Sequence, residues 1–462
     1  MLVDALAEYA RRDAARELPQ EVIHHAKRVL VDWFSALLPG TRVSPAINLV
    51  RTYASELGHG KSSLPGFGTT AFPGTAAWIN GSASHAVEFD DIYRDAIYHP
   101  GCPTIGAALA IAEDQAKSGP DLLKAIIVGY EISTRIGISI QPSHYKFFHT
   151  TGTVGSFGSA AAVAMLMAPG NVEVMRHALA TAASFAAGLQ QAFRSDSMTK
   201  PLHAGHAAWV GVAAGTGAAN GVKGALDILE GDAGFGAALS QGANWELATA
   251  GLGEQYNITK TTQKNHGCCG HTFSALDAVQ LIQQKHPINA AQIDSVVIHN
   301  NKFAIAVTGN YSPKGAAACR FSMPYVIAHQ LLYGPVRIDA FSAERQADPA
   351  IRNLMKKITL QEDPVLMASF PESRRARVVI KMKDGKTFEE CPPYRKGDPE
   401  WQLTDAELNE KFSELTTPVI GEQAAKRLLE QLWSVDKIQI ANLKLAALKS
   451  IAPATRGQST GV

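Results

Sequence analysis

The chain has 462 residues, of which 46% are hydrophobic and 18% are charged. This composition is typical of a globular protein with a large buried interior, and the length suggests two domains. The charges of the 43 basic and 42 acidic side chains nearly cancel. This balance gives no indication that the protein binds nucleic acid or a membrane surface.

The first half of the chain has the pattern of helices. Between residues 22 and 34, apolar residues recur at helical spacing until Pro39–Gly40 ends the pattern. Small residues at high density allow helices to approach closely, so we expect a compact helical bundle with few strands. The Ala- and Gly-rich segments that carry this expectation are 105–113, 126–138, 152–167, 177–187 and 206–220.

The pattern changes near Gly253. Residues 293–300 alternate like a strand, and residues 377–383 and 386–390 predict a hairpin around Asp384–Gly385. Helical patterns lie on either side of the first strand, at 274–284 and 324–332, and return at 405–415, 422–433 and 438–449. We therefore predict a mainly α protein: a large all-helical domain from residues 1–255 and 402–462, and a smaller α+β domain from residues 256–401.

The first stretch that can carry chemistry runs from His85 to His99. Glu88, Asp90 and Asp91 lie between these two histidines, and neighbouring carboxylates can hold their pKa values apart, which suits acid/base chemistry. An acidic loop that caps a helix is the structural alternative. A metal site is another, because histidine and carboxylates are good ligands, but no HExxH-like spacing supports it.

Two histidines, His99 and His149, each precede a helix rich in small residues. The N-terminus of a helix attracts anions through its free N–H groups and its dipole. A histidine in that position can contact a bound carboxylate and also transfer a proton. The alternative is an incidental histidine in a helix-initiating turn.

A third stretch contains Lys200 and His203. Because Lys200 precedes Pro201, we expect an extended backbone there. A lysine between apolar neighbours can pair with a carboxylate, although an isolated lysine is more often solvated.

The stretch from Lys264 to Thr272 contains Cys268 and Cys269. Adjacent cysteines fit poorly around one tetrahedral zinc, and no second CxxC pair is present. Cys269 is either a nucleophile or a small packed side chain. Farther on, Arg320 and Tyr325 can offer a guanidinium and a phenol to a substrate. Nucleotide-binding glycine motifs are missing from the sequence, so we expect no nucleotide cofactor.

These stretches together resemble the MmgE/PrpD family. HAVEFDD followed by HPG is similar to its HAxDFDD…HPG signature, and TKPLHAGHAA to its TKPLHxGxAA segment. KNHGCCGHTFSALDA, FSMPY and GDPEWQLTDAEL resemble three further motifs in the same order. The resemblance covers nearly the whole chain and implies a helical domain with a smaller lid-like α+β domain, a homodimer, and chemistry without a metal or organic cofactor.

Carried over by position, the resemblance implies a site that includes Asp90, His99, His149, Lys200, Lys264 and Tyr325. We predict that the catalytic residues are Asp90, His99, His149 and Tyr325. The residues that we expect to bind the substrate are Lys200, His203, Lys264, Cys269 and Arg320. The chain departs from the family pattern at several positions: Glu88 replaces an aspartate, Ile92 a threonine, Phe273 a histidine, and Cys269 a histidine found in cis-aconitate decarboxylases. The last change counts against decarboxylation.

Known members of the family include 2-methylcitrate dehydratase, cis-aconitate decarboxylase and iminodisuccinate epimerase. We therefore expect a cytoplasmic, cofactor-free hydro-lyase that acts on a tricarboxylate similar to 2-methylcitrate by removing a proton alpha to a carboxylate. The five cysteines, with no evident disulfide framework, fit a reducing compartment. An epimerase, a decarboxylase and a non-catalytic carboxylate-binding protein are the alternatives. Partners other than this substrate and a second copy of the chain are not expected.

Overall fold

A computed structural model describes residues 1–194, 197–370 and 373–451 and is mainly helical, as the sequence predicts. The chain forms two compact units. The first comprises Met1–Ala86, Asp90–Gln263 and the chain from Thr404 onward, and the second comprises Val87–Phe89 and Lys264–Leu403. We propose that these two units are the helical domain and the α+β domain.

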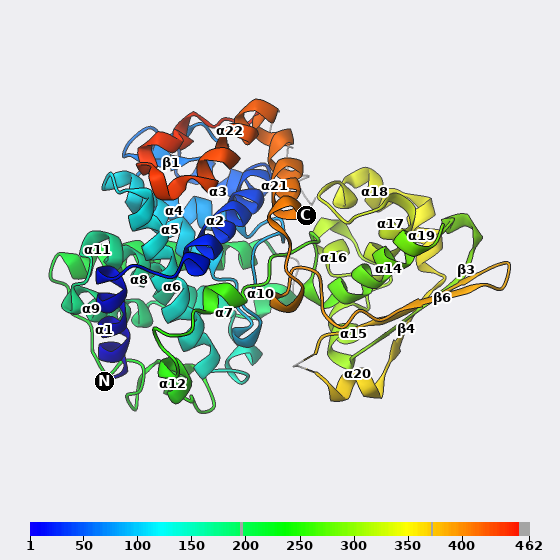
Figure 1. The fold of residues 1–462 in the computed structure, drawn as a ribbon, viewed down its shortest axis with the longest axis horizontal. Coiled ribbons are helices and arrows are strands. Elements are labelled where there is room, and N and C mark those ends of the chain that lie inside the picture. The colour runs from blue at the N-terminus through cyan, green and yellow to red at the C-terminus, as the bar shows by residue number, and fades with distance from the viewer. Residues whose placement is uncertain (195–196, 371–372, 452–462) are drawn as a thin grey trace. The chain divides into compact units, whose positions relative to one another are not determined.

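The first unit is a bundle of helices with one small antiparallel hairpin, β1 (Ser62–Leu64) and β2 (Thr69–Ala71) (Figure 1). Its helices are α1 (Leu2–Ala15), α2 (Gln20–Gly40), α3 (Ala46–Thr52), α4 (Pro73–Ser84), α5 (Gly101–Asp114), α6 (Gly119–Ser139), α7 (Thr150–Thr153), α8 (Gly155–Met167), α9 (Val172–Ser184), α10 (Gln191–Arg194), α11 (Thr199–Ala219), α12 (Phe235–Leu239), α13 (Glu246–Thr249), α21 (Asp405–Ile420) and α22 (Glu422–Trp433).

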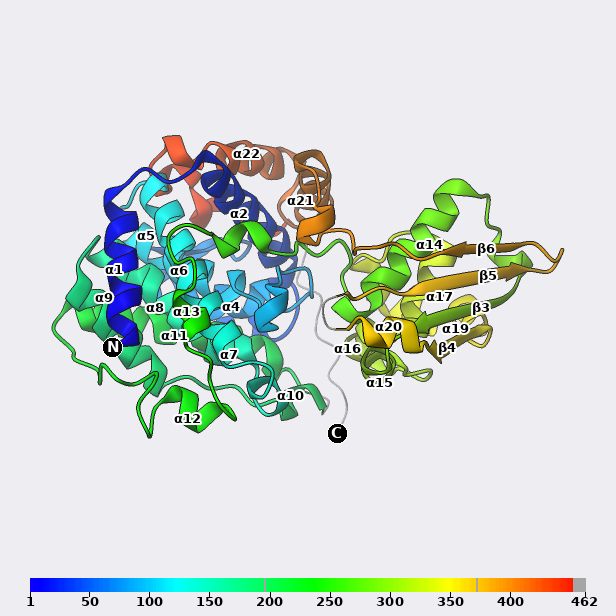
Figure 2. The same ribbon diagram turned by 60° about the horizontal axis from the view of Figure 1, so that its bottom comes forward.

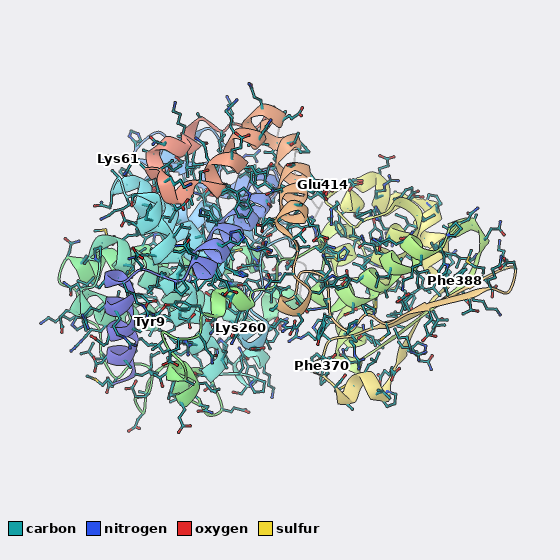
Figure 3. All side chains as sticks on the ribbon, viewed as in Figure 1. Tyr9, Lys61, Lys260, Phe370, Phe388 and Glu414 are labelled. Carbon is teal, nitrogen blue, oxygen red and sulfur yellow. The ribbon has the colours of Figure 1, made fainter. Side chains whose placement is uncertain are left out.

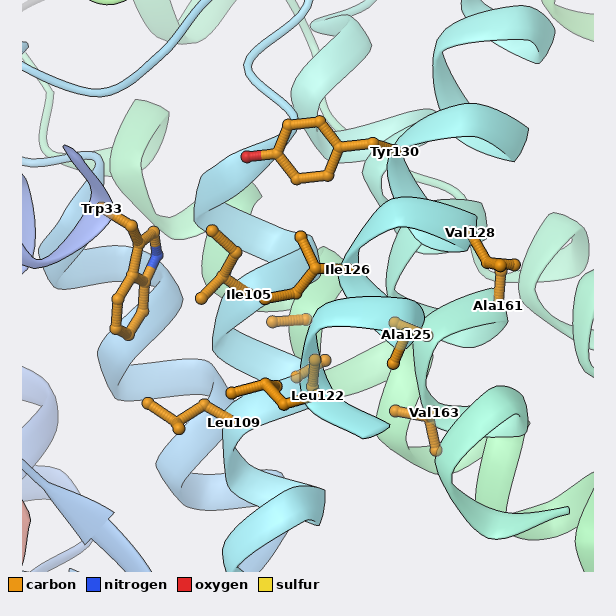
Figure 4. Packing of buried hydrophobic residues seen from close by; sticks show 14 of the residues in the cluster. Trp33, Ile105, Leu109, Leu122, Ala125, Ile126, Val128, Tyr130, Ala161 and Val163 are labelled. Atoms are coloured by element: carbon orange, nitrogen blue, oxygen red, sulfur yellow. The ribbon is translucent and has the colours of Figure 1, made fainter. Parts of the chain in front are cut away.

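Branched apolar side chains fill the core of this bundle where helices cross. In Figure 4, Ile105 and Leu109 of α5 lie beside Ile126 and Leu122 of α6, with Trp33 of α2 on the other side. All five side chains are at most 2% exposed. Each fully buried aliphatic side chain of this size stabilises the fold by roughly 1.5–3 kcal/mol, so this crossing holds the helices that carry the site in place.

Two ion pairs connect α21 to α2. Lys411 of α21 lies 2.7 Å from Asp32 of α2, and both side chains are nearly inaccessible. Arg28 of α2 pairs with Asp405 at the start of α21. Contacts between α2 and α21 thus link the two ends of the chain within one unit, and the buried charges of Lys411 and Asp32 neutralise each other.

The second unit contains a four-stranded sheet in the order β4-β3-β5-β6, flanked by helices (Figure 2). The strands are β3 (Ile293–Asn300), β4 (Ile358–Glu362), β5 (Arg377–Met382) and β6 (Thr387–Glu390). Its helices are α14 (Phe273–Lys285), α15 (Lys302–Thr308), α16 (Gly315–Arg320), α17 (Met323–Tyr333), α18 (Ala343–Ala347), α19 (Pro349–Met355) and α20 (Pro364–Ala368).

Pairing in this sheet is mixed. Strand β3 runs parallel to β4 and antiparallel to β5, which pairs antiparallel with β6. Helix α14 packs on β5 and β6, and α17 packs on β4. Phe388 of β6, labelled in Figure 3, stacks on His286 at the end of α14, with ring centroids 4.3 Å apart. The predicted strand at 293–300 and the predicted hairpin are confirmed.

Two predicted local structures are wrong, and one strand was not predicted. Residues 438–449 form only short 3-10 turns, Ile440–Leu443 and Leu445–Ala447, rather than a helix. Strand β4 was not predicted, because its alternation is short and exposed on most positions. Lys200 lies in the first turn of α11 rather than in extended backbone. Pro201 is tolerated there because N–H groups in the first turn of a helix make no intrahelical hydrogen bond. Within the described ranges, no helix has both the length and the apolar character needed to cross a bilayer.

Candidate active site

The centre of the candidate site in the first unit is the carboxylate of Asp90. Nδ1 of His85 lies 2.7 Å from Asp90 Oδ2, and Nδ1 of His99 lies 2.8 Å from the same oxygen. The Asp90 side chain is 2% exposed and that of His99 is 16% exposed. His85 comes directly after α4, and His99 comes just before α5, so two helix ends bring these rings to one carboxylate.

The partners of these histidines define their tautomers. Asp90 Oδ2 is an acceptor, and Nδ1 of His99 also lies 2.8 Å from the backbone oxygen of Asp91. Each Nδ1 must therefore carry a hydrogen and donate it, which leaves the lone pair of the neutral ring on Nε2. Burial lowers the pKa of His85 to about 4, although Asp90 opposes this shift. His85 is therefore neutral at pH 7.

Asp91 holds the start of α5 beside His99. Its Oδ1 accepts the N–H of Gly101 at 3.0 Å, and its Oδ2 accepts the hydroxyl of Tyr130 at 2.8 Å. Burial raises the pKa of Asp91 to about 7 and nearby Asp32 adds to this, while the two hydrogen bonds act against it. A methyl group on Gly101 would lie 2.8 Å from Asp91 Oδ1, so only glycine permits this close contact.

His149 lies directly before α7, next to both histidines of the Asp90 cluster. Its ring centroid is 5.5 Å from that of His85, nearly parallel to it, and 6.4 Å from that of His99. Nδ1 of His149 lies 3.0 Å from Nδ1 of His203 on α11. Burial lowers the pKa of His149 far below its ordinary value, and the neighbouring histidines and Lys200 lower it further.

Lys200 and His203 both lie in the first turns of α11, and both side chains are partly exposed. Burial lowers the pKa of His203 to about 4, with contributions from His206 and Lys200. Lys200 also lowers the pKa values of His85 and His149, so its positive charge acts on three of these rings. Lys200 therefore supplies a positive charge for binding an anionic substrate, which a neutral imidazole cannot supply.

The second unit contains a separate group of predicted residues. Nζ of Lys264, which is 1% exposed, lies 3.0 Å from Oε2 of Glu88. Burial lowers the pKa of the Arg320 guanidinium, while the charge of Glu88 raises it. The guanidinium lies 4.8 Å from the centroid of the Phe341 ring, and its buried Nε has no hydrogen-bond partner. Glu88 thus pairs with Lys264 and also acts electrostatically on Arg320.

Glu88 has a left-handed backbone conformation, with φ at 61°. Residues other than glycine, asparagine and aspartate rarely adopt this backbone conformation. Where they do, the residue is often at a functional site. Glu88 lies in the stretch identified from the sequence as able to carry chemistry, but no role at the site was predicted for it. A single sequence carries no signal for its backbone angle, which depends on the packing of the loop.

The two remaining predicted residues are engaged within the second unit. The N–H of Cys269 donates to the backbone oxygen of Arg320 at 3.0 Å, and its side chain is 7% exposed. Burial raises the pKa of the neighbouring Cys268 to about 12, so that thiol stays protonated. Tyr325 is fully buried and donates its hydroxyl to the backbone oxygen of Ala340 at 2.6 Å, a contact typical of a structural tyrosine.

Among the residues that the structure describes, one group of three has potential metal-ligand atoms within 4.8 Å of one another: His85, Asp90 and His99. Both imidazoles direct a hydrogen, rather than a lone pair, at the shared carboxylate oxygen. The charge of Lys200 also acts on His85. These contacts fit a hydrogen-bonded proton-transfer group better than a cation site.

Comparison with known proteins gives matches over most of the chain. The MmgE/PrpD N-terminal domain matches residues 4–248, and the MmgE/PrpD C-terminal domain matches residues 266–436. The cis-aconitate decarboxylase-like protein oryM of Aspergillus oryzae is 28% identical over 453 residues, covering 91% of each chain. Cis-aconitate decarboxylase of Homo sapiens is 26% identical over 94% of this chain and 92% of its own length. Cis-aconitate decarboxylase of Aspergillus terreus is 24% identical, over 94% and 93% respectively.

Proposed function

Because the chain belongs to the MmgE/PrpD family, we propose that it is a lyase that acts on a small tricarboxylate and begins by removing a proton next to a carboxylate. Relatives named cis-aconitate decarboxylase support lyase chemistry on a tricarboxylate. The observation that carries the proposal is the pair of imidazoles on Asp90, 2.7 and 2.8 Å from one oxygen.

We assign the base to His99. Asp90 accepts the Nδ1 hydrogen of His99, so Nε2 can take a proton from the substrate, and the carboxylate stabilises the imidazolium that forms. His99 is the more accessible of the two rings, since the side chain of His85 is fully buried. His85 then orients Asp90 and fills the space beside it.

Lys200 supplies the electrostatic part of the reaction. A proton alpha to a carboxylate is weakly acidic, so negative charge grows on the substrate carboxylate as the proton leaves. A preorganised cation at that position lowers the barrier. Because Lys200 acts on His85, His149 and His203, it is the cation of the first unit best placed to do this.

The proton for the leaving hydroxyl comes from His149 in this proposal. Tyr325 is the other predicted acid, but its hydroxyl is used by Ala340. With His99 as base and His149 as acid, the substrate C–H and C–O bonds break and water leaves. The reaction is that of a hydro-lyase on a substrate similar to 2-methylcitrate.

Decarboxylation is the second candidate, since each relative reported above carries that name or a like one. Cys269 favours the hydro-lyase, because by the resemblance it stands where cis-aconitate decarboxylases have a histidine.

The experiment is turnover of 2-methylcitrate, citrate and cis-aconitate in heavy water, followed by proton NMR and by release of carbon dioxide. We expect an unsaturated product, formed by loss of water, from 2-methylcitrate or citrate. Carbon dioxide from cis-aconitate would instead identify a carboxy-lyase, and deuterium exchange without net conversion would identify an epimerase. Absence of all three reactions at substrate concentrations that bind would contradict a lyase.

A further inference from the structure

The hydroxyl-protonating role of His149 raises a chemical difficulty. A ring that is neutral at pH 7 has only its N–H hydrogen to give, and neutral imidazole is a very weak acid. It can deliver that hydrogen only if its other nitrogen receives a proton in the same step. In His149 that other nitrogen is Nδ1, which lies 3.0 Å from Nδ1 of His203.

Building on the proposed function, we propose that His203 is a proton relay that connects His149 to solvent, with His206 as its outer member, rather than a ligand of the substrate. At 3.0 Å one Nδ1 must donate a hydrogen and the other accept it. His203 acts through His149 and does not touch the reacting atoms.

Exposure increases from His149 to the two histidines of α11. His149 is 1% exposed, His203 and His206 are partly exposed, and Trp209, whose ring stacks on that of His206, is 44% exposed. His203 and His206 are three residues apart on α11 and so lie on the same face of that helix. The relay therefore runs from the buried group to the surface along one helix turn.

Close backbone contacts hold the His203 ring toward His149. A methyl group on Gly152 would lie 3.1 Å from Cβ of His203, and one on Gly188 would lie 3.3 Å from the His203 ring. The N–H of His149 donates to the oxygen of Gly188 at 2.9 Å. Gly152 and Gly188 therefore leave room for the His203 ring, and the hydrogen bond from His149 holds Gly188 beside it.

Protons and electrons balance in the relay step. Nε2–H of His149 gives its proton to the leaving hydroxyl, and the C–O bonding pair stays on that oxygen, so water forms. Nδ1 of His149 takes the Nδ1 proton of His203, whose Nε2 takes a proton from water or from His206. The C–H bonding pair forms the carbon–carbon double bond. The proton on His99 returns through solvent to Nε2 of His149, the Nδ1 proton of His149 passes back to Nδ1 of His203, and Nε2 of His203 releases its proton to water. Both rings thereby recover their starting tautomers, and no net charge accumulates.

The first test does not depend on activity. In the intact, unliganded protein labelled with nitrogen-15 at histidine, we expect a coupling across the hydrogen bond between the two Nδ1 atoms. It should vanish in His203→Gln and persist in His177→Gln, a control histidine on α9 that pairs with Glu173. If the wild-type protein shows no coupling, the relay is wrong whatever reaction the enzyme catalyses.

The second test is kinetic. His203→Ala should lower turnover by about 10²-fold, the lower end for acid/base groups, with KM nearly unchanged. Added imidazole should restore turnover of His203→Ala in a saturable way but not of His203→Gln, which fills the space. His206→Gln should slow turnover less, and His177→Gln not at all.

Two results would overturn the relay. The first is a large rise in KM of His203→Ala with normal turnover, which would make His203 a substrate ligand. The second is loss of turnover that imidazole does not restore in a correctly folded variant. Failure of the proposed function is distinct, because the wild-type enzyme would then convert none of the tricarboxylates while the NMR test still decides the relay.

Discussion

At the scale of single residues, the chemistry of the candidate site depends on which nitrogen of each imidazole carries hydrogen. One oxygen of Asp90 accepts from both His85 and His99, which leaves Nε2 of His99 as the base. A substitution at His99 that keeps a hydrogen-bond donor to Asp90 but removes the basic nitrogen distinguishes a positioning role from a role in proton transfer. Asparagine approximates this at His99.

His99→Asn should lower turnover by about 10²–10⁴-fold, the usual contribution of a general acid or base. The apparent affinity for substrate should change little, because the amide keeps a donor near Asp90. Steady-state kinetics on the reactive tricarboxylate measures both quantities, with His177→Gln as the control. A folded His99→Asn enzyme with near-normal turnover would transfer the role of base to His149 or Asp90.

Lys200→Met should weaken substrate binding, since loss of a cation paired with a desolvated carboxylate typically costs roughly 2–5 kcal/mol. It should also raise the pKa values of His85, His149 and His203, because Lys200 lowers all three. The acid limb of the pH profile of kcat/KM should therefore move to higher pH.

Lys200→Arg is the matched variant, because it keeps the charge and should leave the acid limb in place. The geometry of its planar guanidinium differs, so some loss of affinity is expected. Should Lys200→Met retain wild-type kinetics and the wild-type pH profile, Lys200 would be an ordinary solvated lysine.

At the scale of elements, the site depends on how closely α11 approaches its neighbours. Gly211 lies where α11 crosses α8, and a methyl group there would lie 2.0 Å from Cβ of Ser159 and 2.6 Å from its backbone carbon. Gly217, on the same helix, has ordinary contacts: the nearest atom to an added methyl is Cγ2 of Val222 at 3.4 Å. The small residues noticed in the sequence thus have different roles along one helix.

Gly211→Ala should lower the free energy of unfolding by about 1–3 kcal/mol or more, because two backbones must separate. Gly217→Ala should raise it by up to about 1 kcal/mol, since alanine is the better helix former. Chemical denaturation of both variants measures the difference. Equal effects of the two substitutions would contradict the close α8–α11 packing.

At the scale of the whole molecule, burial keeps several histidines neutral. Burial lowers the pKa values of His85, His144 and His203 to about 4 and that of His271 to about 3. In the unfolded chain a histidine binds a proton near pH 6.5. The stability that these groups contribute is thus complete above pH 6.5 and is lost as the pH falls toward their folded-state values.

We therefore expect the free energy of unfolding to fall by several kcal/mol between pH 7 and pH 4, as each unit of pKa shift corresponds to about 1.4 kcal/mol. Urea denaturation at closely spaced pH values measures this. A stability that is constant across the range would mean that these histidines are solvated or paired with carboxylates in the folded protein.

Glu113 should act in the opposite direction. Burial raises its pKa to about 7 although it accepts hydrogen bonds from Ser63. Its neutral form stabilises the fold below pH 4.5, the ordinary value, and this contribution is lost as the pH rises through 7. Glu113→Gln does not titrate, so its stability relative to wild type should increase by up to about 3 kcal/mol from pH 4 to pH 8. A pH-independent difference would contradict the raised pKa of Glu113.

The sequence alone was sufficient for the fold class, for strands β3 and β5 with their hairpin partner β6, and for the helices that follow His99 and His149. These features depend on local periodicity and on turn residues, which a single chain displays directly. The same reasoning failed at residues 438–449, where the apolar residues lie in short turns rather than in a helix. It also failed at β4, because that strand depends on hydrogen bonds to β3 rather than on a local sequence pattern.

Only the tertiary structure decided how the candidate residues group. It joins His85 and His99 through one oxygen of Asp90, pairs His149 with His203, and pairs Glu88 with Lys264 in the second unit. It also shows that the hydroxyl of Tyr325 is used within its own unit. Contacts of this kind join helices far apart in the chain, and burial sets the protonation states, so neither follows from the order of residues.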